Sequence, residues 1–195
     1  MRKTIIRSAL ICLAAIVTAF VLTFGITSLV SPVTMAKWSK SLGLNNAAIR
    51  YYKSAYERNK DFSILADLVN TADIADDDDV LCVYGVKFIS SDEFNDYCAE
   101  YDKNYNLSLS SYNYYCHIVI EALYDKGEIK TAADIAVNFT YEYTRNSPLG
   151  TAIMIAVINN DDEFSGEIVR AYELKEHNID DVSGTLDEDI LLLNK

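Results

Sequence analysis

Glycine and proline are scarce in this chain of 195 residues, which contains 7 glycines and 2 prolines. The turns of many-stranded sandwiches and barrels depend on these two residues, so their scarcity argues against such folds and favours helices. Hydrophobic residues make up 50% of the chain, which is long enough to bury a core without disulfide crosslinks. We therefore expect an all-α protein.

The sequence also lacks the motifs that carry catalysis, phosphate binding or metal binding. It contains no glycine-rich phosphate loop and no G-x-S-x-G motif, and its 4 cysteines do not have zinc-binding spacing. His117 and Glu121 lie four apart on a predicted helix, but the sequence supplies no third ligand. We predict no catalytic residue, no metal and no cofactor. The alternative is an enzyme or ligand-binding domain whose site is not visible in the sequence.

Basic residues are few beyond position 60. The formal charge of the chain is −12, and residues 61–195 alone carry −20 because more than half of the lysines and arginines precede them. A domain of this charge repels phosphates, which argues against binding to nucleic acid. The composition favours a protein or peptide partner, and a basic one in particular.

Charge is absent from residues 8–30, which read SALICLAAIVTAFVLTFGITSLV. A helix needs about 20 apolar residues to cross the hydrocarbon core of a bilayer, so this segment predicts a single transmembrane helix. The alternative is a signal peptide, cleaved after Thr34-Met35-Ala36, that releases a secreted helical domain. Signal peptides have apolar stretches of about 7–15 residues and a better cleavage site, so we favour the retained anchor.

The short segment before the predicted anchor is basic. Residues 1–7 contain Arg2, Lys3 and Arg7, and this cluster is denser than the basic residues that follow the anchor. Positive charge favours the cytoplasmic side of a membrane. We therefore expect a cytoplasmic N-terminus and a domain that lies outside the cytoplasm.

Capping residues divide the rest of the chain into short amphipathic helices joined by short turns. The predicted helices include residues 45–58, 61–75, 111–126, 129–145, 148–160 and 162–176. Short turns make neighbouring helices antiparallel, so residues 31–176 are expected to form a domain of helical hairpins. Residues 177–195 are polar and acidic before they end in an apolar run, and we predict a flexible acidic tail there.

Two segments share a pattern of small and aromatic residues that follow a turn glycine. Residues 43–60 read GLNNAAIRYYKSAYERNK, and residues 122–139 read ALYDKGEIKTAADIAVNF. The residues that carry the pattern are Gly43, Ala48, Tyr52 and Ala55 in the first segment, and Gly127, Ala132 and Ala136 in the second.

Both segments resemble the second helix of a tetratricopeptide repeat. In such repeats, alanines let neighbouring helices approach closely and the aromatic residue fills the gap between hairpins. The resemblance implies a stack of antiparallel hairpins, a tetratricopeptide-like α-solenoid, that binds proteins or peptides. The proline that usually closes each repeat is missing, and residues 61–110 do not match the pattern.

Tyrosine is unusually frequent, at 14 residues. Most of these tyrosines are expected in the core, but a surplus at the surface suits an interface, where tyrosine is favoured. The candidates for contact with a partner are Tyr51, Tyr56 and Tyr114. Together, these features predict a membrane-anchored, non-catalytic scaffold for protein–protein interaction or assembly.

Overall fold

The computed structural model describes residues 12–19, 21, 22, 25, 31–105, 110–175 and 179–193. The described part is helical apart from two short strands, so the all-α prediction is confirmed. By its internal contacts, the chain divides into two compact units, Met1–Thr71 and Ala72–Lys195. Each unit is described in turn.

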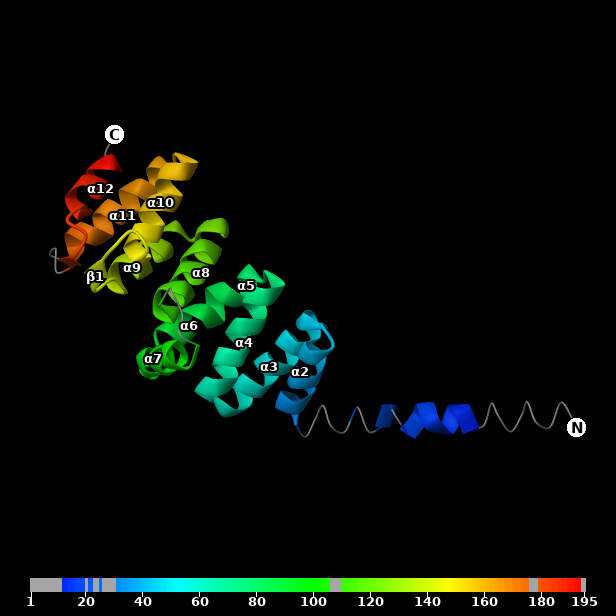
Figure 1. Cartoon of the computed structure of the whole chain (residues 1–195). Helices are drawn as coiled ribbons and strands as arrows, with labels where there is room; N and C mark the ends of the chain where they lie inside the picture. The colour runs from blue at the N-terminus through cyan, green and yellow to red at the C-terminus, as the bar shows by residue number, and fades with distance from the viewer. Residues whose placement is uncertain are drawn as a thin grey trace, which may run out of the picture. The chain divides into compact units, whose positions relative to one another are not determined.

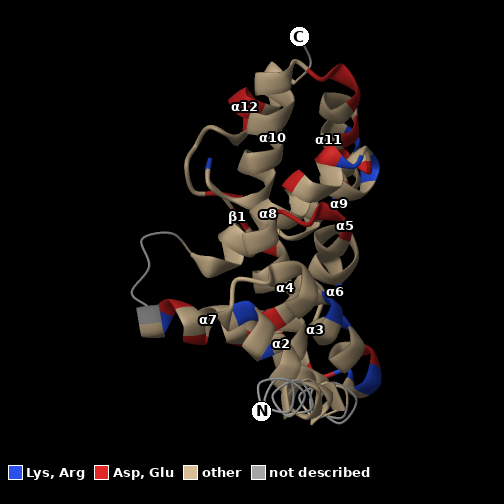
Figure 2. Ribbon diagram, turned by 90° about the vertical axis from the view of Figure 1, so that its right-hand side faces the viewer, with Lys and Arg blue, Asp and Glu red and all other residues tan. Residues whose placement is uncertain are grey.

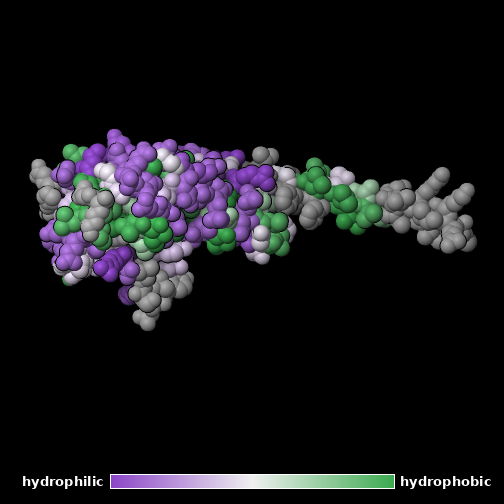
Figure 3. All heavy atoms as spheres, turned by 90° about the horizontal axis from the view of Figure 1, so that it is seen from above, coloured by the Kyte–Doolittle hydropathy of each residue, from purple (hydrophilic) through white to green (hydrophobic). Residues whose placement is uncertain are grey.

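The predicted anchor, residues 8–30, lies partly outside the described residues. Within it, residues 12–19, 21, 22 and 25 are helical and exposed, and most of them are hydrophobic (Figure 3). Searched over the described residues alone, the structure contains no helix with the length and apolarity needed to cross a membrane. Membrane anchoring therefore stays a prediction.

The first unit contains a helical hairpin, in which α2 (Pro32–Ser41) packs along α3 (Asn45–Asn59) (Figure 1). The turn between them uses Gly43, whose φ of 72° is easily reached only without a side chain. Helix α4 (Phe62–Ala75) begins in the same unit. Asp61 caps it, because its carboxylate accepts a hydrogen bond from the Ser63 N–H at 2.8 Å.

The second unit is arranged around α8 (Ser111–Asp125) and α9 (Ile129–Asn138), which pack against each other (Figure 1). The elements that precede α8 in this unit pack against α8, and α10 and α11 pack against α9. The other elements of this unit are α5 (Asp78–Val80), the π-helical turn η1 (Leu81–Gly85), α6 (Val86–Ile89), α7 (Phe94–Tyr105), α10 (Pro148–Asn159), α11 (Asp162–Leu174) and α12 (Leu186–Leu192).

Strands β1 (Glu142–Tyr143) and β2 (Asp180–Asp181) pair in parallel, with Glu142 opposite Asp180. This pairing corrects the prediction of a helix over residues 129–145, since α9 ends at Asn138. The Lys175 ammonium group donates hydrogen bonds to the carbonyls of Val137 at 2.7 Å and Thr140 at 2.9 Å. These bonds satisfy the end of the helix and let the chain leave it in an extended conformation.

The C-terminal segment also differs from the flexible tail that the sequence predicted. Residues 179–193 form β2 and α12, and Ile179 and Leu186 are buried. The apolar side chains of this segment divide between the core and the surface, since Val182, Leu191 and Leu192 are exposed. The segment is therefore part of the folded second unit.

Candidate functional site

An open groove of about 350 Å³ lies in the second unit, beside β1. Its walls come from the start of α8, the end of α9, the β1 segment and the start of α10. The residues that line it are Ser110, Tyr112, Asn113, Phe139, Thr140, Tyr141, Glu142, Thr144 and Pro148. This volume is at the lower end of the range for ligand pockets, and it suits one or two side chains of a bound peptide.

Two tyrosines give the groove its aromatic character. The ring centroids of Tyr112 and Tyr141 lie 6.3 Å apart, and the rings are tilted by 47°. The Tyr112 hydroxyl donates a hydrogen bond to the Phe139 carbonyl at 2.9 Å, and burial raises the pKa of Tyr112. The Tyr141 side chain is 64% exposed. One ring is thus fixed in the wall while the other is available for contact.

The lining of the groove carries one charged side chain, the carboxylate of Glu142. Glu142 is exposed at the rim, and no lysine or arginine is among the lining residues. Lys175 lies beside the groove, with its ammonium 5.8 Å from the centroid of the Tyr141 ring. Burial lowers the pKa of Lys175, and its hydrogen bonds to backbone carbonyls hold the ammonium in place. A cationic group on a ligand could pair with Glu142, because no lysine or arginine of the lining competes for that carboxylate.

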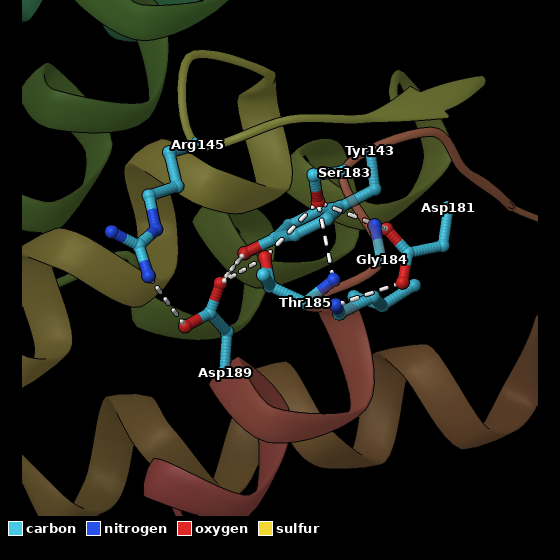
Figure 4. Close-up of polar contacts among 8 residues, drawn as sticks. Tyr143, Arg145, Asp181, Ser183, Gly184, Thr185 and Asp189 are labelled. Atoms are coloured by element: carbon cyan, nitrogen blue, oxygen red, sulfur yellow. Dashed lines mark hydrogen bonds and ion pairs between the residues drawn. The ribbon is translucent and has the colours of Figure 1, made fainter.

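The β1 wall is held from inside by Asp189, on α12 (Figure 4). Its carboxylate accepts hydrogen bonds from the Tyr143 hydroxyl at 2.8 Å and from the Thr185 hydroxyl at 3.0 Å. The Arg145 guanidinium lies 3.7 Å away. Asp189 is only 7% exposed, and a buried carboxylate requires such donors. Burial and the bond to Asp189 raise the pKa of Tyr143.

Asp181 organises the turn that carries Asp189 into place (Figure 4). Its carboxylate accepts hydrogen bonds from the N–H groups of Gly184 at 2.8 Å and Leu186 at 2.9 Å. Since Leu186 is the first residue of α12, Asp181 serves as a cap for that helix. The residues of β2 and α12 therefore act together in holding β1.

A second, smaller hollow in the same unit is acidic. It measures about 140 Å³ and is lined by five acidic and three apolar residues, which are Asp73, Asp76, Asp78, Glu121 and Asp125 with Leu81, Ile118 and Ala122. In the ribbon of Figure 2, acidic residues are coloured red, and they occur near α5 as well as in α12. Desolvation, followed by the charges of Asp125 and Asp76, raises the pKa of Asp78. Among the described residues, no group of His, Cys, Asp or Glu is arranged to hold a metal ion.

The residues singled out for repeat packing lie in helix contacts or at turns. Ala48, Tyr52 and Ala55 are buried on one face of α3, and Ala132 and Ala136 are fully buried on α9. Gly43 and Gly127 both have positive φ, at the turns before α3 and α9. Burial, followed by Asp67, raises the pKa of Tyr52 to about 12.

The three candidate contact tyrosines are divided between the two units. Tyr51 and Tyr56 are half-buried on α3, in the first unit, and the Lys60 ammonium lies 5.0 Å from the centroid of the Tyr56 ring. Tyr114 is on α8 in the second unit, and its hydroxyl donates a hydrogen bond to Asp73 at 2.6 Å beside the acidic hollow. None of the three lines the groove beside β1.

Tyr141 and Glu142 are not among the residues predicted for contact with a partner, because both fell within a predicted helix. A signal was present in residues 140–144, TYEYT, where tyrosine and glutamate alternate among strand-forming residues. The ladder partner of this segment lies more than thirty residues further along the chain, where no comparable pattern occurs.

In comparisons with known proteins, the chain matches no family model, no curated protein and no solved structure.

Proposed function

We propose that this protein is a non-catalytic scaffold for protein–protein interaction or assembly, tethered to a membrane by residues 8–30. The domain lies outside the cytoplasm and has tetratricopeptide-like helical hairpins. The observation that carries the proposal is the open groove beside β1, with one fixed and one exposed tyrosine. Aromatic rings of this kind supply large contact area at small entropic cost, which is why interfaces favour them.

The packing of α2 with α3 and of α8 with α9 supports the tetratricopeptide-like part of the proposal. In each pair a glycine with positive φ forms the turn, and fully buried alanines lie on the second helix. Small residues at these positions let helix axes approach closely, as repeat stacking requires. The acidity of the domain favours a partner with basic segments and disfavours nucleic acid.

The proposal can be tested by crosslinking in the native membrane. A photo-crosslinking amino acid is placed at Tyr141 of the full chain, and a matched variant carries it at Glu163, which is exposed on α11 away from the groove lining. We expect a discrete protein adduct from position 141 that is absent from position 163. Identical adducts at both positions, or no protein adduct at 141, would overturn the proposal and favour an enzyme or ligand-binding domain.

A further inference from the structure

We propose that the groove binds an extended, basic segment of a partner protein, which adds as a strand to the outer edge of β1. This inference rests on the proposed function and specifies how the partner is recognised. It depends on three features of the second unit: the direction of the β1 main chain, the position of the groove, and the charge of its rim.

The pairing of β1 with β2 determines which main-chain groups are left for a ligand. The Asp180 N–H donates to the Tyr141 carbonyl at 3.0 Å, and Glu142 is the register partner of Asp180. In a parallel ladder, a residue bonds to the two neighbours of its register partner and not to the partner itself. The N–H and carbonyl of Glu142 therefore point away from β2, toward the opposite edge of β1.

Neither residue of β2 lines the groove, which places the groove at the outer edge of β1. Tyr141, Glu142 and Thr144 all line it, and the start of α8 forms the facing wall. The edge closes beyond Thr144, whose carbonyl already accepts hydrogen bonds from the N–H and the hydroxyl of Ser147. An incoming strand thus meets one main-chain donor and one acceptor, both from Glu142. Side-chain contacts must supply the rest of its affinity.

The side chains beside β1 determine which kind of peptide segment can bind. Alternate residues of an extended strand point to opposite sides. A residue directed into the groove would contact the rings of Tyr112 and Tyr141, which suits an apolar or β-branched side chain. Its neighbours would pass the carboxylate of Glu142, so lysine or arginine complements it. The occupant is therefore a segment in which basic and apolar residues alternate.

The β1 wall of the groove is preorganised for such binding. Tyr143, the other residue of β1, is 1% exposed and is held by its hydrogen bond to Asp189. A binding edge that is already ordered loses less conformational entropy when the partner adds.

The test measures binding of a fluorescein-labelled peptide of alternating Lys and Val to the purified full chain in mild detergent, by fluorescence anisotropy. Two substitutions at one position separate main-chain recognition from charge. Glu142→Pro removes the outward N–H together with the carboxylate, and it leaves the β2 ladder intact because proline is tolerated at strand edges. Glu142→Gln keeps the N–H and removes only the charge.

At high salt, where loss of the carboxylate has no effect, we expect Glu142→Pro to weaken binding about tenfold, the effect of one lost hydrogen bond. Glu142→Gln should weaken it about threefold at low salt and have no effect at high salt. Hydrogen exchange at Asp180 and the far-UV spectrum check that the Glu142→Pro variant keeps its fold. Methylation of the peptide nitrogens one at a time, with the unmodified protein, provides a second route. One central position should lose about tenfold while its neighbours lose little.

Strand addition is wrong if the peptide fails to bind, if Glu142→Pro binds as tightly as the unmodified chain, or if every methylated peptide binds equally well. A Glu–Val peptide that binds as well as the Lys–Val peptide would overturn the basic character of the segment. The crosslinking experiment at Tyr141 is independent of these outcomes. A discrete adduct there, together with unchanged binding in Glu142→Pro, would leave the scaffold function standing and remove strand addition alone.

Discussion

At the scale of single residues, Asp189 has the most consequence for the groove. It is the only charged side chain that is buried among the described residues, and it holds both β1 and its own turn through hydroxyl donors. A buried donor that loses its acceptor is destabilising, because nothing replaces the water it gave up on folding. The effect of a substitution at Asp189 should therefore extend to β1.

We predict that Asp189→Ala destabilises the C-terminal segment by about 1–3 kcal/mol, since it leaves the hydroxyls of Tyr143 and Thr185 without their acceptor. Hydrogen exchange measured by mass spectrometry should show faster exchange in β2 and α12. Asp187→Ala is the matched control, because Asp187 is exposed in the first turn of the same helix. Equal acceleration in the two variants would show that helix-end charge, and not the buried network, holds the segment.

Tyr52 provides a second prediction at this scale. Its pKa is raised to about 12, so the folded state holds the phenolic proton more tightly than the unfolded chain does. The stability gained from this is fully present below the ordinary tyrosine pKa of about 10 and is lost as the pH rises through 12. In an absorbance titration of the phenolates, we expect Tyr52→Phe to remove a late-titrating group. Loss of a group that titrates near 10 would contradict the burial of Tyr52.

At the scale of elements, the fit of α10 against the β1 segment depends on a glycine. A Cβ atom at Gly150 would lie 2.4 Å from the Thr144 carbonyl oxygen, and this neighbour is backbone that cannot rotate away. We predict that Gly150→Ala lowers the free energy of unfolding by about 1–3 kcal/mol. Urea denaturation followed by far-UV circular dichroism measures this change.

Gly166, within α11, is the control for this substitution. A Cβ there would meet no atom within 4 Å. Since alanine is a better helix former than glycine, Gly166→Ala should raise the stability by up to about 1 kcal/mol. An increase in stability at both Gly150 and Gly166 would show that helix propensity decides both, and that the close contact with Thr144 does not.

Elements whose signals are local could be predicted from the sequence. Ser147-Pro148 predicted the start of α10, and the Ser147 hydroxyl accepts a hydrogen bond from the Gly150 N–H. Asp161 likewise caps α11 through the Phe164 N–H at 2.9 Å. These helices begin where they were expected, because a cap and the helix that it starts lie within a few residues.

Elements that depend on distant partners could not be predicted in this way. The end of α9 is stabilised by Lys175, and β1 exists because β2 pairs with it. Nothing within residues 129–145 shows either partner. The groove was missed for the same reason, since its lining combines the start of α8 with a strand that has no local signal of its pairing.

At the scale of the whole molecule, the location of the domain can be measured directly. A reporter fused after Lys195 is expected to be active outside the cytoplasm, in a protein that stays with the membrane fraction and has the intact mass of the full chain. The reason is the basic cluster of residues 1–7, followed by an uncharged segment long enough to span a bilayer. A mature mass that lacks residues 1–36 would show a cleaved signal peptide, and a cytoplasmic reporter would reverse the orientation.

The pairing of β1 with β2 also has a consequence for the order in which the protein matures. The chain is synthesised from its N-terminus, so residues 141–144 emerge well before the segment that supports them. Until β2 and α12 have followed, Tyr143 lacks its acceptor and the β1 wall lacks its ladder. A nascent or truncated chain would therefore hold no finished groove. Under the proposed function, a partner could be captured only after α12 is in place, so an incomplete chain would not occupy it.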